Sequence, residues 1–186
     1  MPAAALLCAA LALPAPGAGR RPGDPYFLEV VGAEWVYTNG DGKDYGEELT
    51  AVVRKDGAAE LLFGRREGGR VGPLWKARQS PGGVTWLERR GRPLAVPIPL
   101  LKLPVRPGQA WTHTSADGTT STYTTRKWET VTVPAGRFRA VRVDCEWAEN
   151  GRRVRVSDWY APAAGLVYSE EDGRMVRSLK RFTPKK

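Results

Sequence analysis

The chain has 186 residues, of which 41% are hydrophobic and 26% are charged, and its formal net charge is +9. This length suits one domain with its own core, and the composition excludes the disordered and collagen-like classes. Positive charge permits a nucleic-acid partner, but Arg, Ala, Gly and Pro all have GC-rich codons, so genome composition explains it equally well, and nucleic acid is not the expected partner.

The first segment predicts a secretory signal peptide. An apolar run from Ala3 to Leu13 precedes small residues, which is the order of a hydrophobic region and a cleavage region. The run is too short to cross a bilayer, which takes about 20 residues. We expect residues 1–19 to be removed and residues 24–184 to form a single all-β domain. The mature protein would be exported to the periplasm or the extracellular space, with no transmembrane segment and no internal disulfide, because Cys145 is its remaining cysteine.

From Tyr26 onward, turn signals separate segments of strand length. These segments are rich in Val, Thr, Trp, Tyr and Phe, which favour strands, and none has the periodicity of a long amphipathic helix. We therefore predict an all-β, antiparallel fold in which two strand groups form a curved sheet, a half-barrel or a sandwich. The turn signals are Asn39-Gly40, Asp56-Gly57, Gly68-Gly69, Pro81-Gly82-Gly83, Asp117-Gly118, Asn150-Gly151 and Asp172-Gly173.

Residues 93–108 fit neither a strand nor a helix, because their repeated prolines remove backbone donors. We expect this segment to cross between two groups of strands with its apolar side chains buried. A Gly-x-x-Trp-x-ring pattern lies on each side of it, at residues 32–37 and 108–113. In both copies the glycine permits a turn before a strand whose Trp enters the core, so the pattern is typical of two similar β-halves.

The register of one hairpin can be derived, because Asn150-Gly151 fits a two-residue type I′ turn. Counting back from this turn gives one apolar and one charged face. A change of alternation upstream indicates a β-bulge or bend near Ala140. The predicted pairs are Trp147 with Val154, Cys145 with Val156, Glu146 with Arg155, and Asp144 with Ser157.

Two segments carry a family resemblance: VTVPAGRFRAVRV at residues 131–143 and WYAPAAGLV at residues 159–167. Together with the first Gly-x-x-Trp-x-Tyr pattern, they resemble exported bacterial β-proteins of the uncharacterised TapB-like type. The resemblance implies an antiparallel β fold in the cell envelope. It carries over no catalytic residue.

Most catalytic and metal chemistry lacks the residues it needs. His113 is the sole histidine, which excludes sites with two His ligands and leaves Cys145 as its one possible thiol partner. No Gly-x-Ser-x-Gly elbow and no phosphate-binding glycine motif occurs, so we expect no metal and no cofactor. Paired carboxylates stay open, since sequence does not show their spacing; Asp158 is one candidate, although a strand-end aspartate bonded to a turn is the simpler interpretation.

Positive charge concentrates between Arg65 and Arg92, where Glu67 and Glu88 are the acidic residues. Tryptophans alternate with these cations, so the region is a candidate basic and aromatic surface, although a solvated charged face explains it too. The predicted ligand-binding residues are Trp75, Lys76, Arg78, Trp86, Arg89 and Arg90.

The functional hypothesis is a non-enzymatic envelope module that binds an anionic envelope polymer or an apolar ligand. A carboxylate-type glycan hydrolase is one alternative, and a structural or interaction domain is another. A carboxylate pair about 5 to 10 Å apart in a cleft favours the hydrolase, whereas an apolar cavity favours a ligand carrier.

Overall fold

The computed structural model describes residues 25–67 and 70–185, so the predicted signal peptide lies outside the described residues. Twelve β-strands are formed within the described ranges. The first six are β1 (Glu34–Asn39), β2 (Asp44–Lys55), β3 (Ala58–Glu67), β4 (Arg70–Ser80), β5 (Gly83–Arg89) and β6 (Arg92–Lys102). The last six are β7 (Ala110–Thr114), β8 (Thr120–Val133), β9 (Gly136–Glu149), β10 (Arg152–Ala161), β11 (Gly165–Glu171) and β12 (Arg174–Thr183).

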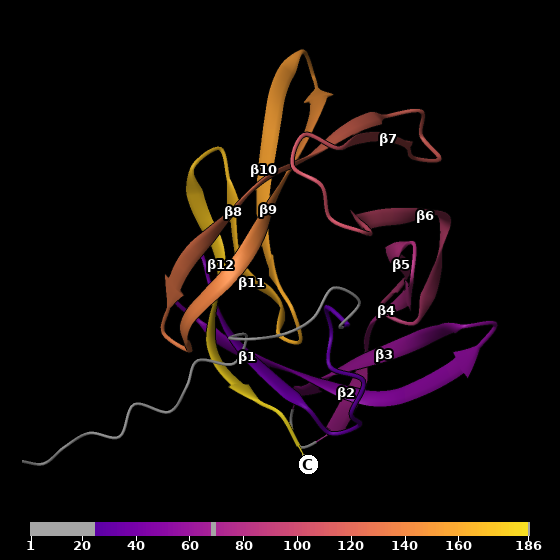
Figure 1. Ribbon diagram of the computed structural model, residues 1–186, viewed down its shortest axis with the longest axis vertical. Coiled ribbons are helices and arrows are strands. Elements are labelled where there is room, and N and C mark those ends of the chain that lie inside the picture. Colours follow the sequence, from indigo (N-terminus) through magenta and orange to yellow (C-terminus); the bar gives the residue numbers. More distant parts are fainter. Residues whose placement is uncertain (1–24, 68–69, 186) are drawn as a thin grey trace, which may run out of the picture.

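All these strands belong to one antiparallel sheet, in the order β6-β5-β4-β3-β2-β1-β12-β11-β10-β9-β8-β7. Each half of the chain is a meander of six strands, and β1 pairs with β12 to join the halves. The sheet curls until its two edge strands, β6 and β7, approach each other (Figure 1). The prediction of an all-β, antiparallel curved sheet built from two strand groups is confirmed.

Four two-residue turns have positive φ at both positions, as type I′ geometry requires. Three of them were predicted: Asp56-Gly57, Asn150-Gly151 and Asp172-Gly173, with first-residue φ of 52°, 50° and 47°. The fourth, Arg90-Gly91, joins β5 to β6 and has φ values of 51° and 71°. It was missed because arginine is not a typical first residue of this turn.

The β9–β10 hairpin has the predicted register. Val154 pairs with Trp147, Val156 with Cys145, and Ser157 with Asp144. The predicted change of alternation in β9 is also present, since Ala140 and its neighbour Val141 are both fully buried. The bulge itself lies on the partner strand β8, between Thr125 and Trp128, where two β8 residues oppose one β9 residue.

The proline-rich segment departs from the prediction in two respects: it forms a strand, and its apolar side chains are mostly not buried, since Val96 is exposed while Leu101 is buried. It does connect the two strand groups, but residues 92–102 form the edge strand β6. Prolines are tolerated there because one side of an edge strand has no ladder to maintain. The Pro99 carbonyl accepts a hydrogen bond from Trp111 Nε1 at 2.9 Å, so the Pro99 backbone faces away from β5 and toward β7.

The two copies of the Gly-x-x-Trp-x-ring pattern occupy equivalent places. Gly32 and Gly108 have φ values of 85° and 82°, and each precedes the first strand of its half. Trp35 and Trp111, three residues later in each copy, are both buried. Leu49 exchanges two backbone hydrogen bonds with residues 32–33, and Thr125, which lies 76 positions further on, exchanges two with residues 108–109.

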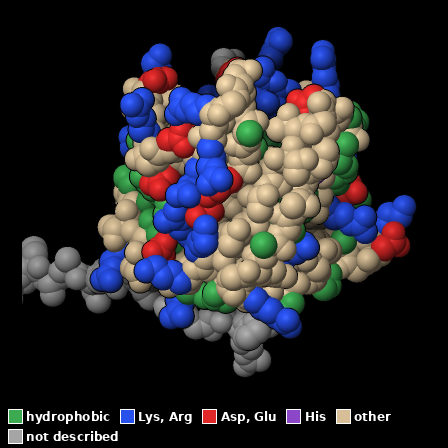
Figure 2. Space-filling view, turned by 90° about the horizontal axis from the view of Figure 1, so that it is seen from above, with side chains coloured by type: hydrophobic (Ala, Val, Ile, Leu, Met, Phe, Trp, Pro, Cys, Tyr) green, Lys and Arg blue, Asp and Glu red, His purple; other side chains and the backbone are tan. Residues whose placement is uncertain are grey.

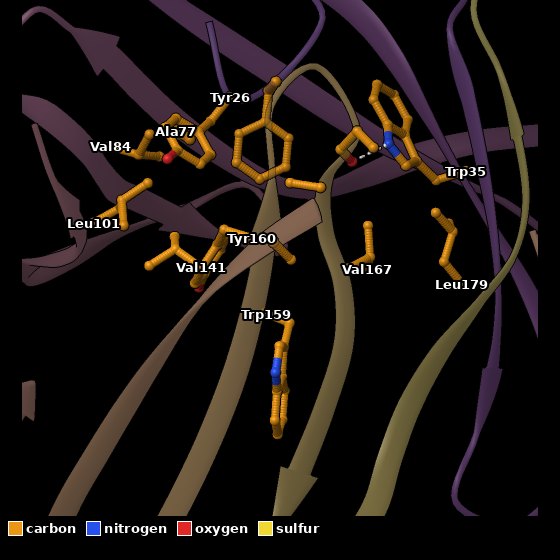
Figure 3. Packing of buried hydrophobic residues seen from close by; sticks show 14 of the residues in the cluster. Tyr26, Trp35, Ala77, Val84, Leu101, Val141, Trp159, Tyr160, Val167 and Leu179 are labelled. Carbon is orange, nitrogen blue, oxygen red and sulfur yellow. Dashed lines mark hydrogen bonds between the residues drawn. The ribbon is translucent and has the colours of Figure 1, made fainter. Parts of the chain in front are cut away.

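Side chains on the inner face of the curled sheet form the hydrophobic core, part of which is drawn in Figure 3. The segment before β1 packs onto this face, where Phe27 lies edge-on to Phe63 and to Trp75, with ring centroids 5.6 and 5.5 Å away. The Gln79 side chain holds the backbone of Phe27: its Oε1 accepts from Phe27 N at 2.9 Å, and its Nε2 donates to Phe27 O at 3.2 Å. The inner face is therefore packed, whereas charged side chains gather mainly on the outer face.

Candidate functional site

The predicted ligand-binding residues do not share one surface. Trp75 lies on the inner face, where its ring stacks on Phe63 with centroids 4.0 Å apart and its Nε1 donates to Glu47 Oε2 at 2.9 Å. The next residue, Lys76, points to the outer face and is paired with Glu88 at 2.7 Å and Glu60 at 3.4 Å. Trp75 is thus a core residue, and the charge of Lys76 is compensated.

The remaining members of the predicted set are more exposed to solvent than Trp75 and Lys76 or are half-buried. Arg78 is exposed and shares the strand phase of Lys76, and Arg89 and Arg90 are exposed at the β5–β6 turn. Trp86 is half-buried and donates from Nε1 to Glu88 O at 2.6 Å. Arg89 lies opposite Trp75 in the β4–β5 ladder, so it does not share the strand phase of Arg78. Neither tryptophan is a free aromatic ring beside these arginines. The binding role of this set stays a prediction.

A second charged surface lies on the outer face of β8, β9 and β10. It contains an open groove of about 530 Å³, whose rim is completed by Pro107 and Gly108 from the connection between β6 and β7. The charged side chains that line the groove are Arg126, Lys127, Arg142 and Arg155, with Glu129 and Asp144. Figure 2 shows the molecule from above, where Lys and Arg side chains lie beside Asp and Glu side chains in a band.

Asp144 organises the floor of this groove. Its side chain is only 3% exposed, and it accepts from Arg126 Nε at 2.8 Å, Arg142 Nε at 2.6 Å and Ser157 Oγ at 2.9 Å. Burial opposes its ionisation, but the hydrogen bonds from Arg142, Arg126 and Ser157 outweigh burial and hold the pKa of Asp144 below its ordinary value. Asp144 is therefore an anion that fixes two arginines by their Nε atoms.

The β8 bulge brings two cations to the groove. Along a regular strand, Arg126 and Lys127 would point to opposite faces. Because both residues oppose the single residue Arg142 between the Thr125 and Trp128 pairs, the alternation is broken there, and both side chains line the groove. Arg155 lies on β10, which pairs with β9, and forms an ion pair with Glu146 at 2.7 Å.

The remaining groove acid, Glu129, is also engaged by the protein. Its Oε1 accepts from Trp159 Nε1 at 2.6 Å, and the Arg142 guanidinium lies 5.2 Å from the centre of the Trp159 ring. The two acids of the groove thus serve to position arginine and tryptophan side chains, while Lys127 is exposed and the Arg126 side chain is 47% exposed. The exposed charge of the groove is mainly positive.

The inner face carries the carboxylates that bear on hydrolase chemistry. Glu47 is 4% exposed; its Oε2 is bonded to Trp75, and its Oε1 lies 3.6 Å from Arg177. Asp158 lies within β10 and accepts from Tyr160 of the same strand at 3.2 Å, so it is not the strand-end aspartate bonded to a turn that the simpler interpretation assumed. Burial raises the pKa of Glu47 and the pKa of Asp158 above their ordinary values. Each of these carboxylate oxygens is therefore already engaged in a contact with another side chain of the protein.

The thiol and the imidazole offer little chemistry. Cys145 is half-buried, and burial raises the pKa of its thiol, which disfavours the reactive thiolate. His113 is 9% exposed on β7, in register with Ser121. Within residues 25–67 and 70–185, no group of three or more His, Cys, Asp or Glu side chains is placed to hold a metal ion. That same part of the chain contains no helix long and apolar enough to cross a membrane.

Sequence reasoning missed the groove. The derived register did place Asp144 opposite Ser157, but Arg126 reaches Asp144 from β8, where the bulge between Thr125 and Trp128 shifts the register that the two-residue turn at residues 134–135 begins. The available signal was the adjacent cation pair Arg126-Lys127 beside a strand whose alternation changes phase.

Comparison with known proteins supports the fold. No protein-family model matches the chain, and no curated protein matches it, so the TapB-like resemblance stays a prediction. A solved structure of a candidate exported protein with a YmcC-like fold from Bacteroides fragilis NCTC 9343 is similar, with a TM-score of 0.56 and 15% identity over 87% of this chain and 100% of that one. A candidate lipoprotein from Parabacteroides distasonis ATCC 8503 is similar too, with a TM-score of 0.52 and 13% identity over 88% of this chain and 100% of that one. At these identities the likeness establishes a shared fold.

Proposed function

We propose that the chain is an exported, non-enzymatic β-domain that binds an anionic polymer of the cell envelope in the groove over β8, β9 and β10. The observation that carries the proposal is the group of four cations around the buried Asp144. Export is supported by the apolar segment Ala3–Leu13 and by the similarity to proteins that are described as exported or as a lipoprotein.

The groove suits repeated carboxylate, sulfate or phosphate groups. Arg126 and Arg142 approach Asp144 through Nε, which leaves terminal guanidinium nitrogens to face the groove; one of those of Arg142 donates to Ser157 at 3.1 Å. Arginine recognises oxyanions by pairs of parallel hydrogen bonds. Because Asp144 holds both side chains in place before binding, less conformational entropy is lost when a ligand arrives.

Two other assignments have less support. A glycan hydrolase needs a carboxylic acid that reaches the scissile oxygen, whereas Glu47 is buried and both its oxygens contact other side chains. The predicted set at Arg78, Arg89 and Arg90 remains a rival anion-binding surface. No buried acid within the described part of the chain orients these arginines, so we expect this surface to bind anions more weakly.

Three variants, each lacking two positive charges, distinguish the surfaces. The groove variant is Arg126→Gln with Lys127→Gln, the rival-surface variant is Arg78→Gln with Arg89→Gln, and the control variant is Arg152→Gln with Arg153→Gln at the β9–β10 turn. Binding of long-chain polyphosphate and of polygalacturonate is measured by calorimetry at low and high salt. Urea unfolding of each variant separates lost binding from lost folding.

We expect the groove variant to bind at least tenfold more weakly than the other two, which corresponds to about 1.4 kcal/mol. Binding by the unaltered protein should nearly vanish at high salt, because the Debye length falls from about 10 Å at 0.1 M to about 3 Å at 1 M. Equal weakening in all three variants would mean that bulk charge alone attracts the polymer. Selective weakening of the Arg78 and Arg89 variant would move the site to the rival surface.

A further inference from the structure

The first strands of the two six-stranded halves differ in how they are paired. In the first half, β1 pairs along its length with β12, and Trp35 lies opposite Phe182 in that ladder. The equivalent strand of the second half is β7, which begins 76 positions later and contains Trp111. On the corresponding side of β7 stands β6, but no ladder joins these two strands within the part of the chain that the structure describes.

A proline helps to explain why this ladder is missing. The Pro99 carbonyl accepts a hydrogen bond from Trp111, so the Pro99 backbone faces β7. In an antiparallel strand, the nitrogen and the carbonyl of a residue point to the same neighbour. Pro99 therefore turns toward β7 a nitrogen that has no hydrogen. β6 thus lacks a donor at a position where a ladder to β7 would need one.

The Trp111 side chain spans the gap instead. The Trp111 indole is 6% exposed and stacks on Tyr123 with ring centroids 5.4 Å apart and planes at 4°. Its Nε1 donates across the gap to Pro99 O at 2.9 Å, and Lys102 Nζ of β6 lies 5.7 Å from the ring centre. This contact does not involve the backbone hydrogen bonds of the sheet.

We propose that the gap between β6 and β7 is a side opening of the curled sheet, which Pro99 prevents from closing as a ladder and which the Trp111 side chain holds shut. Opening the gap breaks one side-chain hydrogen bond and separates a few packed groups, while every ladder of the sheet stays intact. Segments that open without breaking ladders do so at low free energy. The opening exposes the inner-face side chains His113 and Tyr123 to solvent. This inference does not depend on the polymer-binding proposal.

The two equivalent tryptophans supply a matched test in the full chain. Both indoles are buried and both donate to a backbone carbonyl: Trp35 Nε1 donates to Ala164 O at 2.7 Å (Figure 3), and Trp111 Nε1 donates to Pro99 O at 2.9 Å. Solvent exchange of the two indole protons is measured by nuclear magnetic resonance. We expect the Trp111 proton to exchange at least tenfold faster, because Trp35 becomes exposed only when ladders break. Equal exchange rates would overturn the proposal.

A variant tests the role of this proline. Pro99→Val restores a donor that faces β7, so we expect the Trp111 indole proton to exchange more slowly than in the unaltered chain, by about two- to tenfold for one added backbone hydrogen bond. Exchange that is unchanged in a folded variant would show that Pro99 does not keep the gap open. The comparison of Trp111 with Trp35 decides the proposal even if this variant fails to fold.

Discussion

Replacing Asp144 by asparagine should destabilise the protein and disorganise the groove at once. The carboxylate accepts three hydrogen bonds, two from arginines, and each bond to a charged group contributes about 1.5 to 3 kcal/mol. The Arg126 and Arg142 side chains are 47% and 29% exposed, so water recovers part of that loss when the partner is removed. Asparagine retains one acceptor oxygen. We therefore expect Asp144→Asn to lower the free energy of unfolding by about 2 to 4 kcal/mol.

Thermal and urea unfolding measure this effect. A loss of about 3 kcal/mol corresponds to a fall in Tm of roughly 6 to 12 °C for a domain of this size. Because the folded-state pKa of Asp144 lies below its unfolded value of about 3.9, its contribution is complete above that value and disappears as the pH falls through the folded pKa. The difference between the two proteins should therefore shrink below about pH 4. Asp172→Asn, at an exposed aspartate that also accepts from an arginine, is the control, with a smaller expected effect. An Asp144→Asn protein as stable as the parent at neutral pH would refute the reasoning.

Three further predictions concern single residues. Gly165→Ala should cost about 2 to 4 kcal/mol in urea unfolding, because the added Cβ would lie 2.1 Å from the Phe27 ring at a φ of 70°, whereas Gly118→Ala, with positive φ but open space, should cost only about 1 kcal/mol; equal costs would contradict the clash. Cys145 should react with a thiol reagent more slowly than a free cysteine, because burial raises its pKa, and rapid labelling of the native protein would argue otherwise. Burial raises the pKa of Glu47, so the folded chain keeps this proton to higher pH than the unfolded chain does. This group therefore makes the free energy of unfolding fall as the pH rises above about 4.3. Glu47→Gln should remove that fall in urea unfolding measured over a range of pH, and an unchanged dependence of the free energy on pH would count against the prediction.

The parts of the fold that follow from local rules were predictable. The Asn150-Gly151 turn fixes the β9–β10 register because a two-residue loop leaves one way to pair the flanking strands. The repeated glycine and tryptophan pattern likewise marks the first strand of each half. Residues 92–102 were not predicted as a strand, because whether a proline is tolerated depends on whether the strand has a neighbour on that side, which is a property of the whole sheet.

The candidate site was less predictable, for a related reason. A count of arginines along the chain does not reveal the face to which each one points, and Trp75 and Lys76 point to opposite faces because they are adjacent in one strand. The groove depends on contacts between β8 and β9 and on a bulge at Arg126 and Lys127, where pairing and not composition sets the direction of the side chains.

Mapping the ligand contact by nuclear magnetic resonance tests the central claim most directly. The unaltered mature protein is titrated with long-chain polyphosphate at low salt while its backbone amide signals are followed. We expect the largest shifts to fall on the β8 bulge at residues 126–127, on Gly108 and on Arg142 and Arg155, and to reverse when salt is added. Shifts concentrated at Arg78, Arg89 and Arg90, or spread evenly over the surface, would contradict this expectation.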